Sequence, residues 1–163
     1  MKKEKYMETL EIVELTDYET ERGKPMPSKN HGLVQSNIIG LLFAKYRSEY
    51  SFPTELTLEM GKNYVPDICI YPKMTFDAQH DTIRMTQPPI TAIEIVSPKQ
   101  NADDIIEKFE VYFNNGVKSC WYIQPPMATV FIFTPDKKIK VFHEEMLTDA
   151  ATGISIDLNE VFQ

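Results

Sequence analysis

Two acidic residues stand in the middle of strongly apolar stretches. Asp67 lies within the run 64–71, and Glu94 lies within the run 90–96. A buried strand gains nothing from a lone carboxylate, because burying an unpaired charge costs free energy. Two such acids in one small chain indicate a shared cation. A hard divalent ion such as Mg²⁺ (or Mn²⁺) takes one or two carboxylates together with waters and phosphate oxygens. The pattern therefore predicts a Mg²⁺ or Mn²⁺ site at the edge of a sheet.

A lysine stands close to the same predicted site. Residues 102–115 have the spacing of an amphipathic helix whose apolar stripe includes Ile105 and Phe109. Lys108 lies about 60° from the centre of that stripe, so it flanks the buried face. Beside a metal ion, a lysine can position an attacking water or stabilise charge that develops on a phosphodiester.

Simpler interpretations of the same residues stay open. Asp67 could cap a turn, or it could form a plain buried ion pair with Lys108. Asp104 and Lys108 are four residues apart, so they could form only a salt bridge along the helix.

The elements that would position these residues follow from hydrophobic periodicity. Alternation over 54–60 predicts a strand, Gly61 marks a tight turn, and a second strand over 64–71 would carry Asp67 at its middle. The run 90–96 predicts a strand buried on both faces. Because a helix separates it from the next strand, over 117–123, these two strands should be parallel. Two further strands, 127–134 and 138–143, should form a hairpin.

The N-terminal part is less regular. Leu10, Ile12 and Leu15 fit a strand or a short helix, and 18–28 is rich in turn residues. A helix should then run from Ser28 or Asn30 to about Arg47. Near its start His31 and Gln35 share one face, where capping or solvated groups are common. The connection 72–89 is long, and such loops are often functional.

The whole sequence limits the class of protein. Its 163 residues indicate a single domain, 1–163, of the α/β (mixed α+β) class. The net charge of −7 counts against tight non-specific binding of nucleic acid, although a local basic rim or a metal ion can offset it. No Gly-rich phosphate loop or nucleophile elbow is present, so no small-molecule cofactor is implied. Cys69 and Cys120 lie in apolar runs and should be buried thiols. With no signal peptide and no membrane-length apolar run, the expected location is the cytoplasm.

The motifs resemble those of a known nuclease superfamily. Pro66-Asp67 followed by Glu94-Ile95-Val96 resembles the PD-(D/E)xK pattern, with Val96 where that pattern has lysine. In one branch, the Uma-two family of restriction-endonuclease-like domains, the lysine is found on the following helix. The chain is similar to that branch over most of its length, in the pieces Tyr18-Glu19, Gly23, His31, Val65-Pro66-Asp67-Ile68, Ile93 to Pro98, Asp104, Lys108, Tyr112, Gly116-Val117 and Cys120 to Ile123.

The resemblance implies a fold and a function. The fold would be a restriction-endonuclease-like central mixed sheet flanked by helices, and the activity metal-dependent hydrolysis of DNA phosphodiester bonds. Asp67 and Glu94 would bind the metal, and Lys108 would be the relocated catalytic lysine. Glu19 would supply a further acid, with His31 and Gln35 lining the cleft.

Two further expectations concern the oligomeric state and an alternative function. Many proteins of this type act as homodimers, and the apolar hairpin over 127–143 is a candidate pairing surface. Val96 and the acidic balance leave an alternative open, a catalytically inactive nuclease-fold module that binds a partner or nucleic acid.

Overall fold

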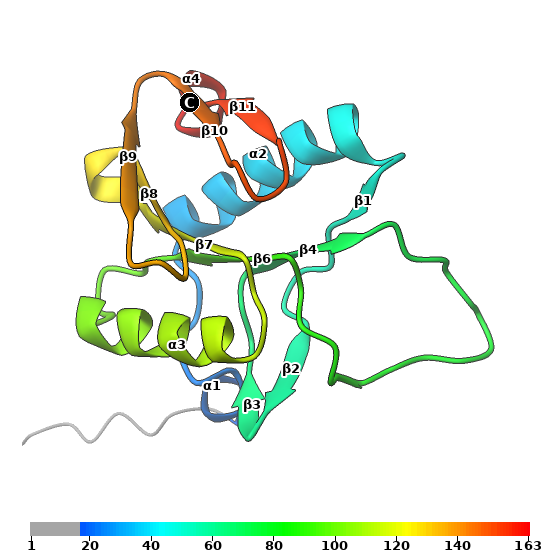
Figure 1. Ribbon diagram of the computed structural model, residues 1–163. Coiled ribbons are helices and arrows are strands. Elements are labelled where there is room, and N and C mark those ends of the chain that lie inside the picture. Colours follow the sequence, from blue (N-terminus) through cyan, green and yellow to red (C-terminus); the bar gives the residue numbers. More distant parts are fainter. Residues whose placement is uncertain (1–16) are drawn as a thin grey trace, which may run out of the picture.

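A six-stranded sheet runs through the centre of the computed structural model, which describes residues 17–163 (Figure 1). Its strands lie in the order β1-β4-β6-β7-β8-β9. Their bounds are Tyr50–Ser51 (β1), Ile68–Pro72 (β4), Thr91–Ile95 (β6), Ser119–Gln124 (β7), Thr129–Phe133 (β8) and Ile139–His143 (β9). Only β6 and β7 are parallel, and the other neighbours are antiparallel. The expected mixed sheet is confirmed.

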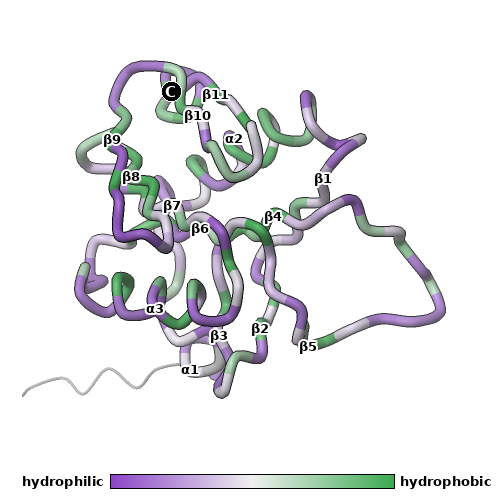
Figure 2. The backbone as a smooth tube through the Cα atoms, viewed as in Figure 1, coloured by the Kyte–Doolittle hydropathy of each residue, from purple (hydrophilic) through white to green (hydrophobic). Residues whose placement is uncertain are grey.

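One long helix covers each face of this sheet (Figure 1). Helix α2 (Lys29–Tyr46) packs Val34, Ile38 and Leu42 against the isoleucines of β4 and β6. Helix α3 (Ala102–Asn114) packs its apolar stripe against the opposite face. Figure 2 shows hydrophobic residues in strands β4 and β8 of this sheet. Side chains of β6 alternate between the two cores, which is why Glu94 is the only charged residue of this buried strand.

The predicted crossover from β6 through α3 to β7 is present. Thr91 to Ile95 pair in parallel with Ser119 to Ile123, and every residue of β6 is buried. Asn101 caps α3 by accepting a hydrogen bond from the Asp103 amide. Gly116 follows the helix with φ of +101°, a conformation that suits glycine. The crossover fixes α3 over the strand that carries Glu94.

The single strand predicted over 64–71 is wrong, because two strands occupy this stretch. β3 (Lys62–Tyr64) pairs with β2 (Thr57–Met60) in a separate small sheet, whereas β4 begins at Ile68. Val65 and Pro66 separate them, and Pro66 has no amide hydrogen to donate to a ladder. Asp67 therefore precedes β4 instead of lying in mid-strand. The turn between β2 and β3 is made by Gly61 at φ +80°.

The remaining elements differ more from expectation. Residues predicted as turns include a helix, α1 (Asp17–Arg22), which ends at Gly23 with φ of +70°. The long connection contains β5 (Arg84–Met85), which pairs in parallel with β2. The C-terminal part forms β10 (Met146–Thr148), β11 (Ser155–Asp157) and α4 (Leu158–Val161). The elements predicted around Leu10, Ile12 and Leu15 lie outside the described residues.

A buried aspartate fastens the C-terminal hairpin to the main sheet. Asp149 Oδ2 accepts hydrogen bonds from Ser119 Oγ at 2.6 Å and from Trp121 Nε1 at 2.7 Å, both on β7. Its Oδ1 accepts the Ala151 amide at 2.8 Å. These donors satisfy the carboxylate without a cation, so the cluster has a structural role.

Two other expectations can be checked directly. Cys69 and Cys120 are both buried free thiols, as predicted. Within residues 17–163, none of the helices has the length and apolar character needed to cross a membrane.

Candidate active site

The two acids are brought together by the pairing of β4 with β6. Ile68 lies opposite Ile93 in this antiparallel pair. In the same register, Asp67 therefore lies opposite Glu94. Both belong to the α3 face of the sheet, in phase with Cys69 and Ala92. Their side chains are 0% and 1% exposed, which makes them a buried acidic pair that needs compensating charge.

That compensation comes from Lys24. Its ammonium group lies 2.7 Å from Asp67 Oδ1 and 3.0 Å from Glu94 Oε2, and the lysine side chain is 1% exposed. Burial disfavours the charged amine, but the charges of Glu94 and Asp67 outweigh burial and raise the pKa of Lys24. Lys24 is thus a charged bridge between the two acids.

Arg22 adds a second cation from the same segment. Its Nη2 lies 2.7 Å from Asp67 Oδ1. Its Nε and Nη2 also form a two-point contact with Glu55, at 2.7 and 2.9 Å. Glu55 is held beside Asp67 by the backbone, since its amide donates to the Asp67 carbonyl at 3.2 Å. The Glu55 side chain is 27% exposed, so this end of the cluster reaches solvent.

Helix α2 contributes two more contacts to Asp67. His31 Nε2 lies 3.0 Å from Asp67 Oδ1, and Gln35 Nε2 donates to the Asp67 backbone carbonyl at 3.1 Å. Ser28 caps the helix by accepting the His31 amide, which fixes the start of α2 next to the acids. The other ring nitrogen of His31, Nδ1, is buried and has no hydrogen-bond partner among the described residues. The resemblance implied that His31 and Gln35 line the cleft, and that role stays a prediction; in the structure both contact Asp67.

The second oxygen of each acid is also occupied. The Ile95 amide donates to Asp67 Oδ2 at 2.6 Å, and the Tyr112 hydroxyl of α3 donates to Glu94 Oε1 at 3.0 Å. Burial, followed by the charge of Glu94, raises the pKa of Tyr112 well above its usual value, so the hydroxyl stays a donor. Every carboxylate oxygen of the two acids therefore accepts at least one hydrogen bond.

The surroundings hold Asp67 in its charged form. Burial alone would raise its pKa, but the hydrogen bond from His31 and the charge of Lys24 outweigh burial and lower the pKa to about 2. Asp67 is consequently an anion across the whole physiological range, as a metal ligand has to be.

The remaining site residues expected from the resemblance are half-buried residues of α3 and α1. Lys108 is half-buried on α3, one turn before Tyr112, as the helix geometry predicted. It forms no ion pair with Asp67, Glu94 or Asp104 in the described structure. Glu19 is half-buried in α1, where its Oε1 accepts the Met26 amide at 3.1 Å. Their catalytic roles stay predictions.

Three contributors were missed by sequence reasoning. Arg22 and Lys24 flank a glycine in a turn-rich stretch, where basic side chains usually lie in solvent. Glu55 comes two residues before β2, and its backbone φ of +53° could not be predicted from the residue pattern. The only available signal was the unbalanced charge of Asp67 and Glu94. It predicts that cations lie nearby, but it does not identify the residues that supply them.

The donor set fits a divalent ion in its chemistry. Asp67 Oδ1 and Glu94 Oε2 converge on one cationic centre, the Lys24 ammonium, and both are hard oxygen donors. Within residues 17–163, no third His, Cys, Asp or Glu joins them in a metal-binding group. Two carboxylates completed by water and phosphate oxygens suffice for Mg²⁺.

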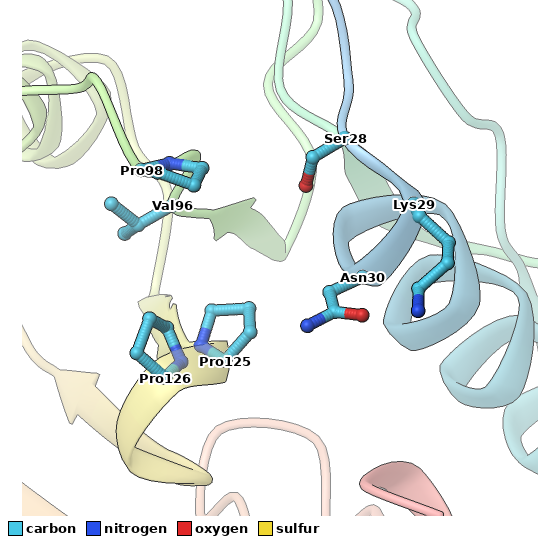
Figure 3. Close-up of a pocket in the computed structure, with 7 residues that line it drawn as sticks. All are labelled: Ser28, Lys29, Asn30, Val96, Pro98, Pro125 and Pro126. Carbon is cyan, nitrogen blue, oxygen red and sulfur yellow. The ribbon is translucent and has the colours of Figure 1, made fainter.

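A groove of about 300 Å³ lies beside the cluster, between the start of α2 and the chain that follows β6 (Figure 3). Ser28, Lys29 and Asn30 lie on one side of it, and Val96, Pro98, Pro125 and Pro126 lie on the other. Asn30 precedes His31, and Val96 follows Ile95, so both walls continue directly into the residues that hold Asp67.

The fold and this site define the class of protein, a restriction-endonuclease-like α/β domain with two acids at one end of the paired strands β4 and β6. The profile of the Uma2 family, described as a putative restriction endonuclease, matches residues 4–159, and the chain belongs to that family.

A solved structure with a similar fold is that of a putative nuclease belonging to DUF820 from Anabaena variabilis. It is 22% identical in sequence, with a TM-score of 0.73 over 85% of this chain and 83% of that chain. No curated protein matches the sequence.

Proposed function

We propose that the protein is a metal-dependent endonuclease that hydrolyses DNA phosphodiester bonds. The observation that supports it best is the convergence of Asp67 Oδ1 and Glu94 Oε2 on one cation, in a chain of the Uma2 family. Asp67 and Glu94 would hold the ion, Mg²⁺ or Mn²⁺. When bound, the ion would supply Lewis-acid polarisation of a phosphoryl oxygen.

Two cationic side chains of the protein would also contribute, one by stabilising negative charge and one by orienting Asp67. Lys24, which contacts both acids, would lie beside the bound ion and would stabilise the negative charge that the phosphorane gains. Arg22, anchored by Glu55, keeps Asp67 oriented. Lys24 is a second candidate for the role of the motif's lysine, because it contacts both acids. Lys108, the lysine that the resemblance implies, stays the first candidate.

Cleavage of supercoiled plasmid and of duplex oligonucleotides in Mg²⁺ or Mn²⁺ tests the proposal. Asp67→Ala and Lys24→Met should abolish cleavage, and EDTA should do the same. Lys108→Ala compares the two candidate lysines directly. Equal activity in the wild type, Asp67→Ala and both lysine variants would eliminate the assignment.

A second candidate is a catalytically inactive nuclease-fold module that binds nucleic acid or a partner. It is favoured by the hydrogen bonds within the cluster, because every carboxylate oxygen of Asp67 and Glu94 already accepts one from a protein group and would have to exchange it for a metal ion. Val96, in the usual lysine position, also favours it. Calorimetry that shows DNA binding without any Mn²⁺ binding would support this candidate over the first.

The protein is further proposed to act as a homodimer, because a dimer has two active sites and can cleave one strand of a DNA duplex with each. The cytoplasmic location expected from the sequence stays a prediction.

A further inference from the structure

Strand β9 forms one edge of the main sheet, and its side chains are unusually apolar for an edge. Ile139 and Val141 are 52% and 55% exposed. Both line a groove of about 480 Å³ together with Ile106 of α3 and the aromatic rings of β8. In residues 17–163 no strand pairs with the outer side of β9. Exposed apolar edges of this kind are usually protected or paired.

The hydrogen-bond pattern shows which backbone groups are free along this edge. The Thr134 amide donates to the Lys138 carbonyl at 3.1 Å, so that pair is a hydrogen-bonded one. Such pairs alternate along an antiparallel ladder. In the register of β8 with β9, the residues bonded to β8 are then Lys140 and Phe142. Ile139, Val141 and His143 direct their N–H and C=O groups outward.

The charges along the same segment are arranged for self-pairing. The sequence from 137 to 145 begins with Lys137 and Lys138, ends with Glu144 and Glu145, and has Val141 at its centre. An antiparallel copy centred on Val141 places Lys138 near Glu144 of the second copy. The only ion pair that Lys138 makes in the described chain is with Asp136, at 3.2 Å, and both groups are mostly exposed. Such a pair is weak and can be exchanged.

The free backbone groups fit the same register. A two-fold axis through Val141 pairs each valine with its copy, and Ile139 with His143 of the second copy. All three are residues with outward N–H and C=O groups, so the register uses each of them. The axis also keeps Ile139 and Val141 of both copies on the α3 face, where they would close the groove together.

We infer that β9 is the interface between two copies of this chain, paired antiparallel about Val141 into one continuous sheet. The occupant is a second copy because the segment complements itself in charge, in apolar surface and in backbone register. The inference specifies the surface of the homodimer proposed above and is independent of the nuclease chemistry.

Charge reversal tests the register. Sedimentation velocity on the full chain should show a dimer for the wild type. Lys138→Glu and Glu144→Lys should each weaken it by about tenfold or more, because each puts two like-charged pairs across the axis. An equimolar mixture of these two variants should recover the wild-type association, since the introduced glutamate of one chain then faces the introduced lysine of the other. Lys118→Glu, on an exposed residue just before β7, should change nothing.

Val141→Lys should give a monomer, because it puts two ammonium groups on the axis. Circular dichroism confirms that these surface variants fold. A wild-type dimer that persists in the variants at 138, 141 and 144 would overturn β9 as the interface while leaving the homodimer in place. Variants that weaken the dimer but do not recover on mixing would overturn the register. A wild-type monomer at about 100 µM, where a dimer of ordinary micromolar affinity forms, would overturn the interface altogether.

Discussion

Lys24 and Asp67 are joined across 43 residues of sequence by a contact of 2.7 Å between an ammonium group and a carboxylate oxygen. Both side chains are buried, so neither charge can be satisfied by bulk water. The same ammonium lies 3.0 Å from Glu94. The segment after α1 is therefore part of the candidate active site, and removing it would leave two buried acids short of a cation.

Lys24→Met should be costly for both stability and activity. Methionine is unbranched and only one heavy atom shorter than lysine, but it leaves Asp67 and Glu94 without the ammonium group that bridges them. Breaking a buried ion pair costs about 3–5 kcal/mol, and losing a charge at the reacting phosphate costs about 100-fold or more in rate. Chemical denaturation and DNA cleavage measure the two effects. Lys118→Met, on an exposed lysine, should change neither, and full stability in Lys24→Met would show that the bridge is dispensable.

The lowered pKa of Asp67 predicts how the free energy of unfolding depends on pH. Its pKa is lowered from 3.8 to about 2, so the folded state favours the carboxylate. The resulting stabilisation, about 2 kcal/mol, is complete above pH 4 and is lost as the pH falls through about 2. Unfolding free energies measured between pH 5 and 2 should fall more steeply for the wild type than for Asp67→Asn. Asp81→Asn, on an exposed residue, should keep the wild-type slope. Parallel curves for Asp67→Asn and the wild type would contradict the lowered pKa.

Tyr112→Phe isolates one hydrogen bond. Phenylalanine preserves the ring packing of α3 but removes the hydroxyl that donates to Glu94 at 3.0 Å. A buried carboxylate oxygen left without a donor costs about 1–3 kcal/mol. Tyr64→Phe is the matched control, because Tyr64 stacks edge-on against Tyr112 and is only half-buried. Urea unfolding should separate the two variants, and equal stability would argue against the hydrogen bond.

Asp149→Ala should affect stability alone. It leaves the buried donors of Ser119 and Trp121 unsatisfied and loosens the C-terminal hairpin, at a cost of about 2–4 kcal/mol. Trp121 is the only tryptophan, so its fluorescence reports both the local change and unfolding. DNA cleavage below the unfolding transition should match the wild type. Loss of cleavage in a folded Asp149→Ala protein would mean that this cluster contributes to function.

Much of the fold followed from the sequence because its central strands and long helices have clear periodicity. The run around Glu94 predicted a doubly buried strand, and the helix after it required a parallel crossover. The break at Val65 and Pro66 was missed, since an apolar run hides where one strand ends and another begins. Helix α1 was missed because charged residues and a following glycine resemble a turn.

The candidate site was predictable in its acids but not in its cations. Asp67 and Glu94 are conspicuous as charges among apolar neighbours. Lys24 and Arg22 are ordinary in their local sequence, and their contacts with Asp67 and Glu94 depend on the three-dimensional path of the chain at the end of α1. His31 and Gln35 were named for the cleft, but the contact of each with Asp67 depends on where α2 begins, which only the three-dimensional structure specifies.

The most direct test of the central claim is DNA cleavage by the wild type, Asp67→Ala and Lys24→Met in Mn²⁺, with Mn²⁺ binding measured on the same samples by calorimetry. The proposal predicts that the wild type binds Mn²⁺ and cleaves DNA. It also predicts that Asp67→Ala does neither and that folded Lys24→Met fails to cleave. Cleavage by Asp67→Ala at the wild-type rate, or a wild type that neither binds Mn²⁺ nor cleaves DNA, would contradict it.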